Sequence, residues 1–315
     1  MVVIPKAQPS TVTAIYRAYE ERAEKRDGRS ISVSTLAEEC QRKLWYDFRW
    51  CSPQEEVPGR TLRIFETGVR EEERWIENLR MIGCEVWDRD ENGNQIKVEA
   101  CGGHVRGYLD SEILGLPEAP KTIHVGEIKS HNAKSFAGVK KDGVRKAKEL
   151  HFGQLQTYMY LRGLDRGIYL AVCKDTDELY AERLHLDVDY VLRLLAKAQR
   201  IIDSHDTPPP ISDKPDFFKC QWCRHKPVCK ENTQPRVNCR TCLFSAPEIG
   251  GSWSCARHAK PLSITEQEEA CPCHLWLPTL IDGEQVDADD EAGTVTYRMA
   301  DGTLWIDGAH EQEAA

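Results

Sequence analysis

The sequence predicts a mixed α/β core followed by a small cysteine-rich module. Between residues 62 and 202, apolar residues recur first at helical spacing, then in short strand-like runs, and then in both patterns again. Helices that alternate with groups of strands are typical of a mixed α/β fold. Beyond Pro208-Pro209-Pro210 the chain is rich in cysteine and has little periodic pattern, so we expect that part to fold differently.

The core elements are expected in the order helix, three strands, helix, two strands and a last helix. The helices are expected at 62–81, 144–161 and 191–202, and the strands at 84–87, 104–114, 122–130, 167–174 and 178–187. Outside the core we expect helices at 14–25 and 34–46, and a hairpin whose strands 294–298 and 303–306 flank Asp301-Gly302.

Composition divides the chain into six segments. These are a lead at 1–30, a helical segment at 31–60, the α/β core at 61–205, a first cysteine segment at 206–235, a second at 236–280 and a hairpin tail at 281–315. No stretch of about 18 apolar residues occurs, which excludes a membrane span. The lead carries charges and no apolar run, which argues against a secretory signal. We therefore expect a cytoplasmic protein.

The charge balance and the cysteine count restrict the class of protein. There are 42 Lys and Arg residues against 51 Asp and Glu, a net charge of −9, which argues against a broad polyanion-binding surface but allows a local basic strip. The 13 cysteines are an odd number in a chain expected in a reducing compartment, so metal ligation explains them better than disulfides. Four isolated cysteines are expected to be small buried side chains: Cys51, Cys84, Cys101 and Cys173.

Two carboxylates and a lysine form the first candidate site. Glu127 and Lys129 alternate along an expected strand, so their side chains share one face while Ile128 points into the core. Asp110 is expected on a neighbouring strand, about 4.8 Å away, where it can meet Glu127 over one ion. Oxygen ligands suit Mg²⁺ or Mn²⁺. The alternative is an ordinary surface strand pair with a salt bridge.

Two helices can add residues to this site. Gly68 would let the first core helix approach the sheet closely, and Glu72 could then reach the same ion. On the next helix, Gln154 and Tyr158 are four residues apart and share a face. Taken singly, Gln154 is typical of an exposed polar residue and Tyr158 of a core aromatic.

Together these residues resemble the RecB-like branch of the PD-(D/E)XK nucleases. That branch carries Gly-x-x-x-(His or Glu) on a helix, an Asp strand, Glu-x-Lys, and Gln-x-x-x-Tyr on a helix. The chain has all four motifs in order: Gly68 and Glu72, Asp110, Glu127 and Lys129, and Gln154 and Tyr158. Position 72 is Glu where many members have His, which bears on metal preference.

This resemblance implies a restriction-endonuclease-like fold and a role for each matched residue. The ion would be held by Glu72, Asp110, Glu127 and the carbonyl of Ile128. Lys129 would orient the attacking water, and Gln154 and Tyr158 would steady the lysine and the phosphate. The residues implied to be catalytic are Asp110, Glu127, Lys129, Gln154 and Tyr158.

Four cysteines flank the core in a split pattern. Three stand at C-x2-C-x5-C spacing and one lies far upstream: Cys220, Cys223, Cys229 and Cys40. This arrangement resembles the iron–sulfur nucleases, namely the CRISPR-associated RecB-like exonucleases (the fourth Cas family) and the AddB nuclease domain. The resemblance covers residues 30–230 and implies a [4Fe–4S] cluster that clips the two ends of the core, although four thiolates would also suit Zn²⁺. If Cys40 is simply buried, Cys239 or His225 is the alternative fourth ligand.

A second cysteine cluster follows and has the pattern of a zinc ribbon, a C-x2-C knuckle with later Cys and His residues. The favoured Zn²⁺ ligands are Cys239, Cys242, Cys255 and Cys271, and the alternates are His258, His274 and Cys273. With little apolar periodicity, this segment could hardly fold without a metal. Similar cysteine-rich extensions follow the nuclease core in phage-encoded relatives, so the resemblance implies a phage origin.

Six cations lie between the Glu-x-Lys motif and Gln154: Lys134, Lys140, Lys141, Arg145, Lys146 and Lys148. Beside a metal site they would guide a phosphate backbone, and the expected DNA contacts are Lys140, Lys141, Arg145 and Lys146. The alternative is a solvated helix face. Aromatic residues near Cys40 could stack bases of a single strand, but core packing is expected for most of them: Trp45, Tyr46, Phe48 and Trp50.

The sequence therefore predicts a Mg²⁺- or Mn²⁺-dependent deoxyribonuclease with a [4Fe–4S] cluster and a Zn²⁺ module. The resemblance implies an exonuclease that acts on single-stranded 5′ ends in DNA recombination, repair or phage DNA processing, in the cytoplasm of a bacterial host if the chain is phage-encoded. The alternatives are an endonuclease, a CRISPR-adaptation trimming factor, or a non-catalytic DNA-binding or partner-docking protein. A homo-oligomer is compatible with any of these.

Overall fold

The computed structural model describes residues 10–23, 28–54 and 56–308 and divides into two compact units. The first unit contains Met1–Asp27, Glu55–Lys97 and Tyr108–Leu186, and the second contains Gly28–Gln54, Val98–Gly107 and Asp187–Ala315. Each unit therefore combines segments that are distant in the sequence. No helix of the described residues is long and apolar enough to cross a membrane.

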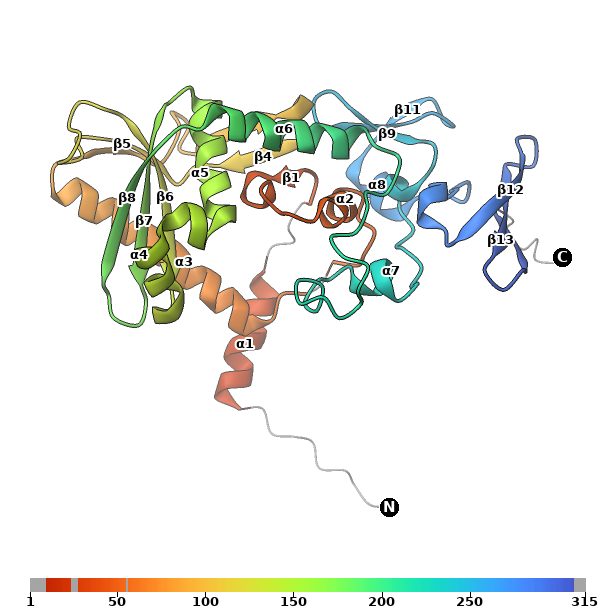
Figure 1. The fold of residues 1–315 in the computed structure, drawn as a ribbon, viewed down its shortest axis with the longest axis horizontal. Coiled ribbons are helices and arrows are strands. Elements are labelled where there is room, and N and C mark those ends of the chain that lie inside the picture. The colour runs from red at the N-terminus through yellow and green to blue at the C-terminus, as the bar shows by residue number, and fades with distance from the viewer. Residues whose placement is uncertain (1–9, 24–27, 55, 309–315) are drawn as a thin grey trace, which may run out of the picture. The chain divides into compact units, whose positions relative to one another are not determined.

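A five-stranded mixed sheet forms the centre of the first unit (Figure 1). Its strand order is β2-β5-β6-β7-β8, in which β6 and β7 run parallel and the other neighbours run antiparallel. The strands are β2 (Glu85–Trp87), β5 (Ser111–Leu114), β6 (His124–His131), β7 (Arg166–Cys173) and β8 (Leu179–His185). The predicted mixed α/β fold is confirmed.

Helix α3 (Gly59–Met81) covers one face of this sheet. Trp75, Ile76 and Leu79 form its buried stripe and pack with Ile128 of β6 and with Ile168 and Leu170 of β7. Because side chains alternate along a strand, the residues next to these point to the other face. Residues such as Glu127 and Lys129 therefore face away from the apolar side of α3.

Helices α4 (Ala133–Ala147) and α5 (Glu149–Arg162) belong to the other face (Figure 1). A Cβ on Gly167 of β7 would lie 2.8 Å from the sulfur of Met159, so this glycine lets α5 approach the strand closely. The N-terminal α1 (Thr11–Arg22) packs on α3, where a Cβ on Gly59 would meet the Tyr16 carbonyl oxygen at 2.2 Å.

The described part of the second unit contains one long helix, three short ones and three small sheets. The helices are α2 (Gln41–Phe48), α6 (Val188–Asp203), α7 (Lys226–Lys230) and α8 (Ile264–Glu269), with 3-10 turns at Val33–Thr35, Cys101–Gly103, Cys239–Thr241 and Pro278–Leu280. The sheets have the orders β1-β4-β3, β11-β10-β9 and β12-β13-β14. Their strands are β1 (Ile31–Ser32), β3 (Lys97–Ala100), β4 (Val105–Tyr108), β9 (Ser245–Glu248), β10 (Ser252–Cys255), β11 (Lys260–Leu262), β12 (Gly283–Asp289), β13 (Thr294–Met299) and β14 (Leu304–Asp307).

Most predicted elements are present, but several boundaries were wrong. The helix expected at 34–46 begins only at Gln41, because Val33–Thr35 forms a 3-10 turn and Cys40 is the residue that precedes the helix. The strand expected at 104–114 is two strands, β4 and β5, separated by Leu109 and Asp110. The described part of the helix expected at 14–25 is α1, and residues 24–25 lie outside the described residues.

The largest error concerns the helix expected at 144–161. The chain has two helices there, α4 and α5, which meet at Lys148, and α4 begins eleven residues earlier than expected, at Ala133. Asn132 marks this start because its side chain accepts a hydrogen bond from the Ser135 N–H at 2.9 Å. Gly143, with φ of 74°, interrupts the helical backbone of α4. Strands β1, β3 and β9 to β12 were also not predicted.

Candidate active site

Strand β6 places Glu127 and Lys129 on the same face of the sheet. Glu127 is fully buried, and its carboxylate forms an ion pair with the ammonium of Lys129. The neighbouring strand can lie close because of Gly126, since a Cβ at that position would be 2.4 Å from the hydroxyl of Ser111. The sequence pattern Gly-Glu-x-Lys therefore combines a close strand contact with two charged groups.

Asp110 lies beside this pair, although not on a strand as predicted. It occupies the short break before β5, whose first residue, Ser111, pairs with Gly126 of β6. Its Oδ2 atom accepts a hydrogen bond from the backbone N–H of Ile128 at 2.7 Å and lies 3.8 Å from the Nζ atom of Lys129. The antiparallel register thus brings Asp110 next to Glu127.

Glu72 of α3 is the third carboxylate near the lysine. Its pKa is raised to about 7, chiefly by burial and also by the charge of Asp110, and the Lys129 ammonium offsets part of this rise. The neighbouring Glu71 instead pairs with Arg74 at 3.6 Å. The proposed role of Gly68 was wrong: a Cβ there would meet no atom within 4 Å, so this glycine is not needed for close packing.

The three acids and the lysine are strongly coupled. Burial raises the pKa of Glu127 to about 8, an effect that Lys129 opposes and Asp110 reinforces. Burial alone would lower the pKa of Lys129, but Glu127 and Asp110 outweigh it and raise that pKa. The lysine therefore stays charged among the carboxylates, while Glu127 and Glu72 each gain or lose a proton near neutral pH.

These donors suit a hard divalent cation. Oε1 of Glu127 pairs with Lys129, whereas Oε2 is buried and has no hydrogen-bond partner among the described residues, as expected of an atom that binds an ion. The carbonyl of Ile128, the fourth predicted ligand, accepts a hydrogen bond from Lys129 at 3.1 Å. Within the described chain, however, the carboxylates of Glu72, Asp110 and Glu127 do not place three ligand atoms within 4.8 Å of one another. The donor chemistry fits Mg²⁺ or Mn²⁺.

Helix α5 brings together the predicted glutamine and tyrosine. Both side chains are buried, and Nε2 of Gln154 donates to the hydroxyl of Tyr158 at 3.3 Å. Burial raises the pKa of Tyr158, and the charge of Glu127 raises it further. The phenol is therefore neutral and lies within electrostatic reach of the carboxylates.

Sequence reasoning missed a chain of hydrogen bonds beside Lys129. The Tyr169 hydroxyl, on the β7 residue that pairs with Glu127, contacts Nε2 of His131 and Nδ1 of His151, each at 2.8 Å. Burial lowers the pKa of His131 to about 4 and that of His151 to about 3, and Lys129 adds to both shifts. Both imidazoles are therefore neutral. One signal was available, since His131 follows Lys129 by two residues and so shares its strand face.

The four cysteines predicted to bind iron lie in the second unit. Burial raises the pKa of Cys220 and Cys223, and the Cys40 thiol is near enough to raise both further. Arg42, two residues after Cys40, has its guanidinium 3.8 Å from the sulfur of Cys229. The thiols share one neighbourhood but do not form a group of three ligand atoms within 4.8 Å in the described residues.

The alternative fourth ligands are used elsewhere. His225 is buried, with Nδ1 bound to the Ser52 hydroxyl and Nε2 to Oδ1 of Asp47, both at 2.8 Å. Cys239 belongs to the second cysteine cluster. The aromatic residues that follow Cys40 are buried, so they pack in the core and do not offer a stacking surface: Trp45, Tyr46, Phe48 and Trp50.

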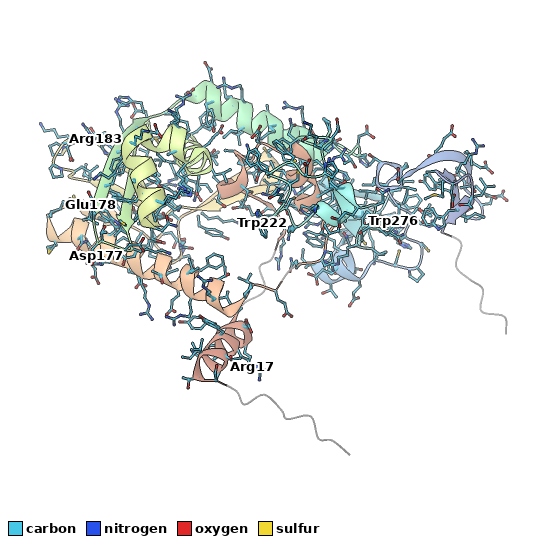
Figure 2. The ribbon with its side chains drawn as sticks, turned by 60° about the horizontal axis from the view of Figure 1, so that its bottom comes forward. Arg17, Asp177, Glu178, Arg183, Trp222 and Trp276 are labelled. Atoms are coloured by element: carbon cyan, nitrogen blue, oxygen red, sulfur yellow. The ribbon has the colours of Figure 1, made fainter. Side chains whose placement is uncertain are left out.

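The predicted basic strip lies on α4, and acids neutralise part of it. Lys140 forms an ion pair with Glu178 in the turn between β7 and β8 (Figure 2), and Lys146 lies 3.2 Å from Asp142. The Arg145 guanidinium stacks 4.9 Å above the ring of Phe152. The remaining predicted DNA contact, Lys141, is exposed, as are Lys134, Lys140, Arg145 and Lys146.

Comparisons with known proteins give a distant likeness. No family model matches the chain, and no curated protein matches its sequence. Among solved structures it is similar to SSO0001, with 16% identity, a TM-score of 0.40, and coverage of 71% of this chain and 98% of that one. It is also similar to LHK-Exo, an alkaline exonuclease from Laribacter hongkongensis, with 12% identity, a TM-score of 0.40, and coverage of 60% and 89%. For the structure of LHK-Exo in complex with dAMP, the identity is 11% and the TM-score is 0.38, with coverage of 60% of this chain and 89% of that one.

Proposed function

We propose that this chain is a Mg²⁺- or Mn²⁺-dependent deoxyribonuclease. The observation that carries the proposal is the arrangement on β6, where buried Glu127 and Lys129 share a face and Asp110 is hydrogen-bonded to the residue between them. Three carboxylates and one ammonium suit phosphodiester hydrolysis, in which negative charge develops on the phosphate.

Each residue has a task that its position supports. Asp110, Glu127, Glu72 and the Ile128 carbonyl would hold the ion, which when bound polarises the phosphate and acidifies water. Lys129 would orient the attacking water and balance charge on the phosphate, because Glu127 and Asp110 keep it protonated. Gln154 and Tyr158 would hold the lysine and the phosphate in register from α5.

The substrate we infer is DNA with free single-stranded 5′ ends. This part of the proposal rests on the motif order that the chain shares with RecB-like exonucleases: Glu72, Asp110, Glu127-x-Lys129 and Gln154-x-x-x-Tyr158. We further propose that Cys40, Cys220, Cys223 and Cys229 bind a [4Fe–4S] cluster. The electrostatic coupling of Cys40 to Cys220 and Cys223 supports that ligand set, and thiolates are the usual ligands of such clusters.

Digestion of labelled DNA tests the proposal. Linear single strands labelled at the 5′ or the 3′ end, linear duplexes and circular single strands are incubated with protein and Mn²⁺, with and without a chelator. A 5′ exonuclease shortens only linear strands and releases the 5′ label first. Cleavage of circles would make the enzyme an endonuclease, and tight binding without any cleavage would favour the non-catalytic alternative.

Matched variants connect the activity to the site. Glu72→Gln removes a carboxylate whose charge interacts with those of Asp110 and Lys129, whereas Glu71→Gln removes the adjacent carboxylate that pairs with Arg74. We expect the first variant to lower the cleavage rate at least tenfold and the second to leave it near that of the wild type. Equal rates in the two variants would remove Glu72 from the proposed site.

A further inference from the structure

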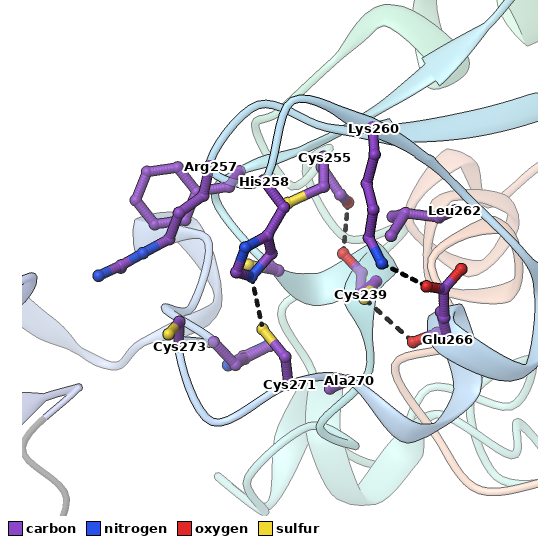
Figure 3. A pocket seen from close by; sticks show the side chains of 14 residues that line it. Cys239, Cys255, Arg257, His258, Lys260, Leu262, Glu266, Ala270, Cys271 and Cys273 are labelled. Atoms are coloured by element: carbon purple, nitrogen blue, oxygen red, sulfur yellow. Dashed lines mark hydrogen bonds and ion pairs between the residues drawn. The ribbon is translucent and has the colours of Figure 1, made fainter.

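A second group of metal-ligand side chains surrounds a cavity of about 290 Å³ in the second unit (Figure 3). Its lining includes five cysteines from three separate segments of chain, and four of them form the proposed ligand set: Cys239, Cys242, Cys255 and Cys271. Three of these four are at least 90% buried, and only Cys271 among them is partly exposed. This cavity contains none of the residues assigned above to DNA cleavage.

The first two cysteines lie on a rigid backbone turn. The N–H of Cys242 donates to the carbonyl of Cys239 at 3.0 Å, and Asn238 and Thr241 cap the turn reciprocally. Arg240, between the two cysteines, is fully buried and donates to Oε1 of Gln267 at 2.9 Å. These bonds fix the turn, so both thiols are presented to the cavity without a further ordering cost.

The third and fourth cysteines reach the cavity from other elements. Cys255 ends β10 and pairs with Ser245 of β9, whose hydroxyl donates to the Cys239 carbonyl. Cys271 follows α8, and this helix lies near the turn because the Cys239 thiol donates to the carbonyl of Glu266 at 3.2 Å. Burial raises the pKa of Cys239 to about 12, with Cys242, Cys271 and Cys255 adding to the rise, so all four thiols lie within electrostatic reach.

Other potential ligands lie at the edge of the cavity. His258, Cys271 and Cys273 place three ligand atoms within 4.8 Å of one another, and Nε2 of His258 lies 3.5 Å from the sulfur of Cys271. Cys239, Cys242 and Cys255 do not belong to such a group in the described residues. His258 is exposed, and Cys271 and Cys273 are both partly exposed. His274 is buried, but its Nε2 atom lies 3.3 Å from the hydroxyl of Thr241. Cys271 is the member of this outer group whose charge also acts on Cys239 and Cys242, so it is the one that joins the three buried thiols.

We propose that Cys239, Cys242, Cys255 and Cys271 bind one structural Zn²⁺ ion. A C-x2-C turn with two further thiolates supplies the four sulfur ligands of a closed tetrahedral site, which leaves no position open for substrate. The ion would tie α8 and the loop after it to the sheet β9–β11. Zn²⁺ binding to such a small module also supplies folding free energy. This site is independent of the proposed nuclease centre and goes beyond it.

Metal analysis of the full-length protein tests the proposal without any DNA. The wild type should carry one zinc per chain, and Cys255→Ser should lower this to below 0.2 per chain while leaving bound iron unchanged. Cys273→Ser is the matched control and should keep its zinc. Loss of zinc in Cys273→Ser but not in Cys255→Ser would overturn the ligand set, as would iron in place of zinc at this site.

A second measurement does not depend on how the variants fold. Wild-type protein is alkylated with iodoacetamide under native conditions, and the modified cysteines are located by mass spectrometry. We expect Cys271 to be protected although it is partly exposed, and Cys273 to be modified, with protection of Cys271 lost when zinc is removed with a chelator. Equal modification of Cys271 and Cys273 in zinc-loaded protein would exclude Cys271 as a ligand.

Replacing zinc with Co²⁺ gives an absorption spectrum that distinguishes four sulfur ligands from three sulfur ligands plus His258. We expect the Co²⁺ spectrum of His258→Ala to be the same as that of the wild type.

Discussion

The Oδ2 atom of Asp110 accepts a hydrogen bond from the backbone N–H of Ile128 at 2.7 Å. This bond connects the break before β5 to the middle of β6, between the two charged residues Glu127 and Lys129. The position of the Asp110 carboxylate is therefore set by the backbone of the sheet as well as by the charge of the lysine. One side chain thus has two separable roles, a structural one and a proposed chemical one.

Two substitutions of Asp110 should separate these roles. Asp110→Asn keeps an oxygen that can accept the Ile128 hydrogen bond, so we expect normal stability but a cleavage rate lowered at least 100-fold. Asp110→Ala should lose cleavage and also about 1–3 kcal/mol of unfolding free energy, because the buried N–H is left without its partner. Urea denaturation and single-turnover cleavage in Mn²⁺ measure the two effects. Wild-type cleavage by Asp110→Asn would contradict the proposed ion site.

The raised pKa of Glu127, about 8, predicts a pH-dependent stability. A carboxyl whose pKa is raised on folding stabilises the fold fully below its unfolded pKa, and this contribution is lost as the pH rises through the folded pKa. Between pH 7 and 9, without added Mg²⁺ or Mn²⁺, the wild type should lose about 1 kcal/mol of unfolding free energy from this group, since one pKa unit equals about 1.4 kcal/mol. Urea denaturation at each pH measures this loss. Glu127→Gln cannot titrate and should not show this loss. Parallel stability profiles of the wild type and Glu127→Gln against pH would contradict the raised pKa of Glu127.

The hydroxyl of Tyr169 should stabilise the first unit through its two histidine partners. Tyr169→Phe leaves one ring nitrogen of the buried His131 and one of the half-buried His151 without their shared partner. We expect a loss of about 1–3 kcal/mol of unfolding free energy, measured by urea denaturation. Tyr108→Phe is the control, since Tyr108 is 51% exposed, and it should change stability by less than about 0.5 kcal/mol. A similar loss in both variants would show that the network contributes nothing specific.

The fold could be predicted from the sequence where one periodic pattern dominates. Helix α3 has apolar residues at roughly helical spacing, and β7 is a short apolar run, so both elements could be placed from spacing alone. Helix α4 was missed because its start depends on the Asn132 cap and its irregular end on Gly143, both of which are local backbone features. Short elements such as the 3-10 turn at Val33–Thr35 have too few residues to show a period.

The candidate site was predictable in composition but not in detail. The alternation of Glu127 and Lys129 follows from strand geometry, and the contact between Gln154 and Tyr158 follows from helical spacing. The position of Asp110 in a strand break, and its bond to Ile128, depend on the register of β5 against β6, which no local pattern specifies. The Tyr169 network was missed for the same reason, because it joins residues of β6, β7 and α5.

Cys40 should be required for iron binding. The anaerobically purified wild type is expected to be brown, with broad visible absorption and about four irons per chain. Cys40→Ser should lose the colour and most of the iron, because one of four thiolate ligands is removed, and it should be less stable. Iron analysis and thermal denaturation measure these effects, and Cys51→Ser is a control because Cys51 is a buried cysteine outside the proposed ligand set. A colourless wild type that holds two zinc ions would replace iron by zinc at this site.

The exposed cations of α4 should control DNA binding through their charge. Changing Lys140, Lys141, Arg145 and Lys146 together to Glu should weaken binding of single-stranded DNA steeply, and the slope of log K against log salt should flatten by up to about 3 if all four contact phosphates, since each contact contributes about 0.7. The ion pairs of Lys140 with Glu178 and of Lys146 with Asp142 reduce the expected change for those two residues.

A second variant, Glu178→Gln, tests the same surface in the opposite direction, because it would release Lys140 from its ion pair and should tighten DNA binding. Fluorescence anisotropy across a salt series measures both slopes. Should neither variant change the affinity or its salt dependence, α4 is only a solvated helix face and the DNA must bind elsewhere.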